Sequence, residues 1–196
     1  MKDIEDLCTA GLASVAFYYF DFNDSGKQDL RGLLSSLLTQ LCARSDHRCS
    51  ILSTLYSMHD SGGKQPSETE LARCLKEVLA VPGEEIYIIV DALDECPNNF
   101  GMPSSREKVL NLVEELVTLP LRHLHICITS RPEVDIRMVL ESLTSCRVSL
   151  HEEGGQKQDI IDYIKSVVES DPKMRRWSLE DKLLVIDTLS RRADGM

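Results

Sequence analysis

The 196-residue sequence contains no apolar run that approaches the roughly 18 residues needed to span a membrane. The stretch from Met1 to Asp6 carries charges where a signal peptide needs an apolar core. Positive charge is scarce, since 22 lysines and arginines face 32 aspartates and glutamates and the net charge is −10. We therefore expect a soluble, cytoplasmic protein that enters no membrane. Nucleic acid is excluded as the main partner, because binding a phosphate backbone requires a broad basic surface.

The seven cysteines offer neither a disulfide framework nor a zinc site. Their number is odd, they are widely spread, and no two of them form a C-x-x-C pair. We expect reduced thiols in an intracellular protein. Cys96 adjoins an acidic turn, and because nearby carboxylates should disfavour its thiolate, it is a poor candidate nucleophile.

Strand-like apolar segments alternate with amphipathic helical segments along most of the chain, which predicts an α/β fold with a parallel sheet and three layers. The apolar run at 86–90 is almost continuous, which is typical of a strand buried on both faces. We expect this core to cover residues 1–152 and a helical region to begin over 153–196. The predicted strands lie near 14–21, 86–90, 124–129 and 147–150.

Three carboxylates follow directly on the second predicted strand, in the turn Asp91-Ala92-Leu93-Asp94-Glu95. Ligands of open α/β folds bind at this carboxyl edge of the sheet. A carboxylate directly after the strand can hold Mg²⁺ through water, and one a few residues later can orient or deprotonate an attacking water. Asp91 is the candidate metal ligand, and Glu95 or, as second choice, Asp94 is the candidate catalytic residue. An ordinary acidic loop with a helix-capping aspartate is the alternative.

The next predicted strand ends in Thr129-Ser130-Arg131-Pro132, at the same edge of the sheet. A hydroxyl and a guanidinium at this place could contact the γ-phosphate of a nucleotide, and Ser130 and Arg131 are the candidate cofactor-binding residues. A solvated surface arginine is the alternative for Arg131. The two turns together are more specific than either one alone.

The sequence lacks the phosphate-binding loop G-x-x-x-x-G-K-S/T, in which backbone N–H groups and a lysine hold the phosphates. Gly26-Lys27 has Asp21 at the position of the first glycine and Gln28 after the lysine. Gly63-Lys64 has Met58 and Gln65 at these places. We interpret both as ordinary loops.

With these two turns and the strand end Phe20-Asp21-Phe22, the chain resembles NACHT-type STAND P-loop NTPases over nearly its whole length. The nephrocystin-3-like NACHT modules of large fungal receptor-like proteins are the most similar. A small residue, Ala92, directly after the metal-binding aspartate and followed by two acidic residues is the feature that most resembles NACHT domains. The acidic strand end is then a Walker B segment at 86–95, and 124–131 is a sensor segment.

The resemblance implies that Asp91 helps to coordinate Mg²⁺, that Glu95 positions the hydrolytic water, and that Arg131 or Ser130 contacts the γ-phosphate. Mg²⁺ and ATP or GTP would be the cofactors of the intact parent, with no tight binding by this chain alone. The family's phosphate loop would lie upstream of Met1 and its helical region would continue past Met196. The family's first strand would lie between 124–129 and 147–150, so its absence would leave two apolar strand edges unpaired. We then expect either a poorly stable domain or one that borrows a strand.

Three functions are compatible with this pattern. The first is part of a nucleotide-dependent signalling switch whose NTP-bound form opens and oligomerises, with hydrolysis by this chain not expected. The second is a non-catalytic module that associates with itself or docks on homologous full-length NACHT proteins. The third and weakest is a metal-dependent hydrolase that uses Asp91, Asp94 and Glu95.

Overall fold

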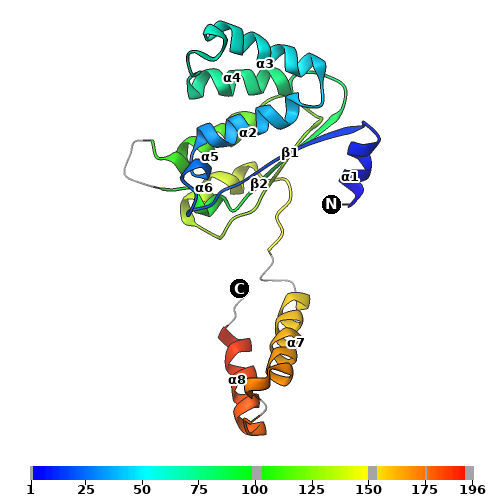
Figure 1. The fold of residues 1–196 in the computed structure, drawn as a ribbon, viewed down its shortest axis with the longest axis vertical. Helices are drawn as coiled ribbons and strands as arrows, with labels where there is room; N and C mark the ends of the chain where they lie inside the picture. The colour runs from blue at the N-terminus through cyan, green and yellow to red at the C-terminus, as the bar shows by residue number, and fades with distance from the viewer. Residues whose placement is uncertain (1, 99–102, 150–153, 175, 193–196) are drawn as a thin grey trace. The chain divides into compact units, whose positions relative to one another are not determined.

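The computed structural model describes residues 2–98, 103–149, 154–174 and 176–192 (Figure 1). It divides into two compact units, Met1–Thr144 and Ser145–Met196, and each is described by itself. The domain boundary predicted between 152 and 153 lies outside the described residues, because 150–153 are not among them.

The first unit alternates strands and helices, as the sequence predicts. Short 3₁₀ turns at Ser25–Lys27, Asp60–Gly62 and Leu93–Glu95 join some of these elements. The helices and strands are α1 (Lys2–Thr9), β1 (Ala13–Tyr19), α2 (Leu30–Cys42), α3 (Asp46–Met58), α4 (Glu68–Leu79), β2 (Glu85–Asp91), α5 (Ser105–Val117), β3 (Leu124–Ile128) and α6 (Val134–Leu143).

The three strands form a parallel sheet in the order β1-β2-β3, which confirms the predicted α/β fold. Tyr19 pairs with Asp91, and Val90 pairs with Ile128, so all three strands end at the same edge of the sheet. This is the carboxyl edge, at which the sequence places its candidate site. The loops after β1, β2 and β3 therefore come together there.

The strand predicted at 147–150 is not formed by its described residues, 147–149. Val148 is 67% exposed. A strand requires a hydrogen-bonded neighbour to satisfy its backbone, and this segment has no strand partner in the described part of the chain. Leu150 lies outside the described residues.

The hydrophobic core lies on one face of the sheet. Helix α2 packs on β1 and also contacts α4 and α5, and its leucines from Leu33 to Leu41 are almost wholly buried. Ile86, Ile88 and Val90 of β2 point into this core and are at most 2% exposed. The broad apolar face of α2 thus forms one continuous core with the covered face of the sheet.

The other face of the sheet is largely open in this unit. Tyr87 and Ile89 of β2 are only partly buried, and Phe17 and Tyr19 of β1 are 56% and 45% exposed. The prediction that 86–90 is buried on both faces is therefore wrong for the described structure. Its continuous apolar run reflects one covered face and one face whose apolar side chains are only partly buried.

The two edges of the sheet differ. At the outer edge of β1, the Gln40 side chain accepts the N–H of Phe17 at 3.0 Å and donates to its carbonyl at 2.7 Å. The amide thus satisfies the outward-facing backbone groups of Phe17, which an edge strand would otherwise leave unpaired. At the opposite edge, β3 pairs only with β2 among the described strands.

The second unit is a pair of helices, α7 (Gly154–Ser170) and α8 (Leu179–Arg192), with a 3₁₀ turn at Pro172–Met174 between them. The two helices pack against each other. Across the described ranges, every helix is too short or too polar to cross a lipid bilayer.

Candidate functional site

The turn after β2 has an unusual backbone conformation that the loop after β3 holds in place. Ala92 is left-handed, with φ 53° and ψ 47°, which is uncommon for a residue other than glycine. Its N–H donates to the Thr129 hydroxyl at 3.0 Å, and the next N–H, of Leu93, donates to the Thr129 carbonyl at 3.0 Å. The ends of β2 and β3 are therefore joined at the candidate site, and backbone strain at such a place is compatible with a functional role.

Asp91 is the last residue of β2, and its carboxylate accepts the hydroxyl of Thr129. The Asp91 side chain is exposed at the carboxyl edge of the sheet. Mg²⁺ retains several waters in proteins and is commonly held by one or two carboxylates together with substrate phosphates. The oxygens of Asp91 and Thr129 fit such a water-mediated ion. The Thr129 hydroxyl, at the end of the neighbouring strand, can fix the orientation of the Asp91 carboxylate.

The three carboxylates of the acidic turn do not converge on one point. Asp91 bonds to Thr129, Asp94 accepts the N–H of Arg131 at 3.0 Å, and Glu95 accepts the N–H of Phe22 at 3.2 Å. No group of three or more histidines, cysteines or acids in the described part of the chain could hold a metal ion. This separation disfavours a metal-dependent hydrolase that uses all three carboxylates.

Asp94 acts mainly on the loop after β3. Its side chain is only 9% exposed, and it also forms an ion pair of 3.4 Å with the Arg131 guanidinium. Both oxygens therefore have partners within the chain, which leaves Asp94 less suited than Glu95 to act on a water. The Arg131 side chain is 79% exposed and could reach a ligand. Ser130 instead donates its hydroxyl to the Arg131 carbonyl at 2.8 Å, so its role as a phosphate contact stays a prediction.

A surface hollow of about 400 Å³ lies beside the acidic turn. Glu95 reaches it from the turn, and the loop after β1 forms another part of its wall. That loop is held by the Gln28 side chain, which donates to the carbonyls of Asp21 and Phe22 at 3.2 and 2.6 Å. The lining includes Phe22, Gln28, Asp94, Glu95, Arg106 and Arg131. Of the five predicted site residues, Asp94, Glu95 and Arg131 line this hollow, and Asp91 lies at the adjoining end of β2. The fifth, Ser130, bonds within its own loop.

Arg106 and Thr129 are the residues at this edge that sequence reasoning did not select. Thr129 is part of the motif from which Ser130 was chosen, and only the strand register shows that it faces Asp91. Arg106 lies in the first turn of α5 and is 9% exposed. Nothing in its local pattern distinguishes it from a solvated helical arginine.

Cys96 is fully buried next to the acidic turn, and burial raises the pKa of its thiol to about 12. Arg106 opposes this increase and Asp29 adds to it. The predicted low reactivity therefore agrees with the structure. Its predicted cause is wrong, because burial has the largest effect on the pKa and the contributing acid is Asp29, which lies outside the turn.

Cys96 is expected to resist alkylation in the folded chain. At pH 8 a pKa near 12 gives roughly a thousandfold less thiolate than an ordinary thiol, and burial also blocks access. Exposed Cys127 on β3 is the internal control. Mass spectrometry after a short iodoacetamide pulse should find Cys127 modified and Cys96 unmodified until urea unfolds the chain. Equal labelling of the two in the folded state would contradict the described burial.

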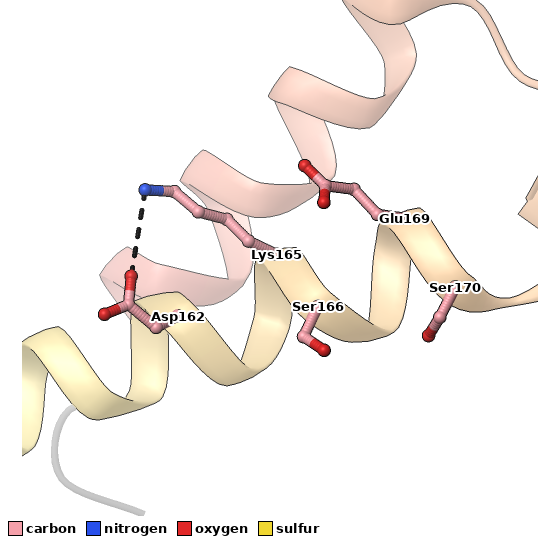
Figure 2. A pocket seen from close by; sticks show the side chains of 5 residues that line it. All are labelled: Asp162, Lys165, Ser166, Glu169 and Ser170. Carbon is pink, nitrogen blue, oxygen red and sulfur yellow. Dashed lines mark ion pairs between the residues drawn. The ribbon is translucent and has the colours of Figure 1, made fainter.

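A second hollow of about 500 Å³ lies along α7 (Figure 2). Lys165 forms an ion pair of 4.0 Å with Asp162 one turn earlier on the helix, and Ser166 and Ser170 point away from Lys165 and Glu169. An exposed ion pair of this kind contributes little to the stability of the fold, because water screens the attraction between the charges. These side chains form no catalytic arrangement, so we place the candidate site at the carboxyl edge of the sheet.

A family model described as "Nephrocystin 3, N-terminal" matches residues 2–131. The match covers all three strands, the acidic turn and the loop after β3 up to Arg131. No curated protein and no solved structure matches the chain.

Proposed function

Because the chain belongs to the nephrocystin 3 N-terminal family, we propose that it supplies the metal-binding and phosphate-sensing edge of a nucleotide-dependent signalling switch of the NACHT/STAND NTPase class. The nucleotide would be ATP or GTP with Mg²⁺. The observation that carries the proposal is the Asp91–Thr129 hydrogen bond, which joins two strand ends beside the exposed Arg131.

The residues at this edge fit separate tasks. Asp91 would hold the ion through water, and Thr129 would fix the Asp91 carboxylate. When bound, Mg²⁺ would neutralise phosphate charge that the surrounding acids would otherwise repel. Arg131 has a guanidinium suited to phosphate oxygens. Glu95 would orient a water. It could do so while it keeps its hydrogen bond to the Phe22 N–H, or after that bond is released.

Hydrolysis by this chain alone is not expected. The lysine and the backbone cradle that bind phosphates are missing from the sequence, and they provide much of the binding energy of P-loop proteins. Affinity for nucleotide should therefore be weak, and the site should be detectable mainly through its metal ion.

Mn²⁺ can replace Mg²⁺ as a paramagnetic probe of this site. In ¹H–¹⁵N spectra of the full chain, millimolar Mn²⁺ is expected to broaden first the amides of the acidic turn and of the loop after β3. Asp91→Asn should abolish this selective broadening, since it removes the charged ligand. Asp162→Asn, which changes an exposed acid on α7, is the matched control and should leave it intact. Uniform broadening of all exposed acids, or an unchanged pattern in Asp91→Asn, would refute the metal site.

A non-catalytic interaction module is the second candidate, and the open sheet face favours it. Leu12, Phe17 and Tyr19 expose 45% to 59% of their surface on or beside β1. Exposed apolar patches of this kind commonly mark protein contacts. Nucleotide-independent assembly with a full-length homologue, measured by sedimentation and weakened by Phe17→Thr, would support this function. Assembly that requires nucleotide would instead support the switch.

A further inference from the structure

Arg106 connects three segments at the carboxyl edge of the sheet. Its Nε donates to the Cys96 carbonyl at 2.9 Å, and its Nη2 donates to the Asp94 carbonyl at 2.6 Å. Its Nη1 lies 3.3 and 3.2 Å from the two oxygens of Asp135. Asp135 lies in the first turn of α6, which follows the loop after β3. One buried guanidinium therefore joins α5, the acidic turn and α6.

We propose that Arg106 is the positioning residue of this site: it locks the acidic turn and the loop after β3 into one unit and thereby sets the placement of Asp91 and Arg131. The inference deepens the proposed function and rests on it, because the placement matters only if these side chains serve a metal ion and a phosphate. Arg106 itself touches neither ligand in this account.

Besides the hydrogen bonds of Thr129 to the acidic turn, two further links join the turn to the segment after β3, and Arg106 supports both. The first is Asp94, whose carboxylate accepts the Arg131 N–H at 3.0 Å, and whose own carbonyl is held by Arg106. The second is Asp135, which pairs with Arg106 and also accepts the side-chain amide of Asn98 at 3.0 Å. Loss of Arg106 would loosen both of these links, although the hydrogen bonds of Thr129 to the turn would remain.

The chemistry of the site requires an arginine. A planar guanidinium can serve two carbonyls and one carboxylate at fixed angles, whereas a lysine ammonium is a point charge on a flexible stem. Burying a charge at 9% exposure is costly unless its N–H groups are used. Each of the three guanidinium nitrogens has an acceptor here, so the cost is offset by bonds that orient the turn.

The test compares Arg106→Lys with Arg31→Lys in the full chain. Arg31 is a partly buried arginine of α2 that donates to the Pro66 carbonyl at 2.8 Å, far along the chain from the acidic turn, and it controls for loss of an arginine as such. In Arg106→Lys we expect the Arg131 amide to exchange about tenfold faster with solvent, because its charge-assisted hydrogen bond is loosened. We also expect the Mn²⁺ concentration that broadens the acidic turn to rise severalfold. Neither quantity should change in Arg31→Lys.

Asp135→Asn is the second variant and is needed if Arg106→Lys does not fold. It removes only the link to α6. The exchange rate of the Arg131 amide and the Mn²⁺ concentration that broadens the acidic turn should both rise, but less than in Arg106→Lys. Unchanged exchange at Arg131 in a folded Arg106→Lys or Asp135→Asn chain would overturn the inference. If Mn²⁺ broadens no specific site in the unmodified chain, the proposed metal site fails, and amide exchange still decides whether Arg106 positions the loops.

Discussion

Replacement of Ile88 by alanine is expected to lower the free energy of unfolding by about 3–4 kcal/mol, while the same change at Ile89 should cost only about 1 kcal/mol. The two residues are neighbours on β2 and differ in the face to which they point. Ile88 is 1% exposed in the core under α2 and α4, whereas Ile89 lies on the open face and is only partly buried. Truncation at Ile88 removes apolar contacts and leaves a cavity, but truncation at Ile89 does neither to the same extent.

Urea unfolding followed by circular dichroism measures both effects. If Ile88→Ala does not fold, Ile88→Val and Ile89→Val give the same comparison. The loss in the free energy of unfolding should then be about 1 kcal/mol for Ile88→Val and close to zero for Ile89→Val. Equal losses at the two positions would mean that the second face of the sheet is covered in solution. That result would contradict the one-sided core.

The second large effect is expected at the opposite, amino end of the sheet. Arg48 is 1% exposed, and its guanidinium pairs with Glu84 and lies 3.3 Å from the Ser14 hydroxyl. Ser14 in turn donates to Glu84 at 2.7 Å. Glu84→Ala would leave a buried, uncompensated cation, so we expect a loss of about 3 kcal/mol in the free energy of unfolding.

A double-mutant cycle separates the interaction energy of Arg48 with Glu84 from the contribution of each side chain alone. Arg48→Met should cost less than Glu84→Ala, because Glu84 is partly exposed and keeps the hydrogen bond from Ser14. The double variant should recover part of the loss. Glu77→Ala is the matched control, since Glu77 faces Arg73 at 4.0 Å on the surface of α4 and should change stability by at most about 0.5 kcal/mol. A similar small effect for Glu84→Ala would show that the Arg48 pair is not buried.

The sequence predicted those features that depend on local periodicity. The strands predicted at 86–90 and 124–129 differ from β2 and β3 by at most one residue at each end, which is within the usual uncertainty of such boundaries. The acidic turn was placed at the carboxyl edge because a buried strand must end where its apolar run ends. The parallel arrangement followed from the regular alternation of strands and helices.

The contacts within the site could not be predicted, because they join residues far apart in the chain. Thr129 bonds to Ala92 and Asp91 only through the register of β2 with β3. The left-handed backbone of Ala92 directs the following carboxylates to different partners, although the sequence places them side by side. A burial pattern also depends on what covers each face, so an apolar run could not reveal that one face of β2 is open.

We propose that the carboxyl edge of this sheet holds a divalent cation at Asp91. Anomalous diffraction from crystals of the full chain soaked in Mn²⁺ tests this most directly, because the anomalous signal distinguishes the metal from water and from light ions. We expect a single dominant anomalous peak beside the Asp91 carboxylate and the Thr129 hydroxyl, and none there in Asp91→Asn crystals. Peaks only at other acidic side chains, or a peak that persists in Asp91→Asn, would contradict the account.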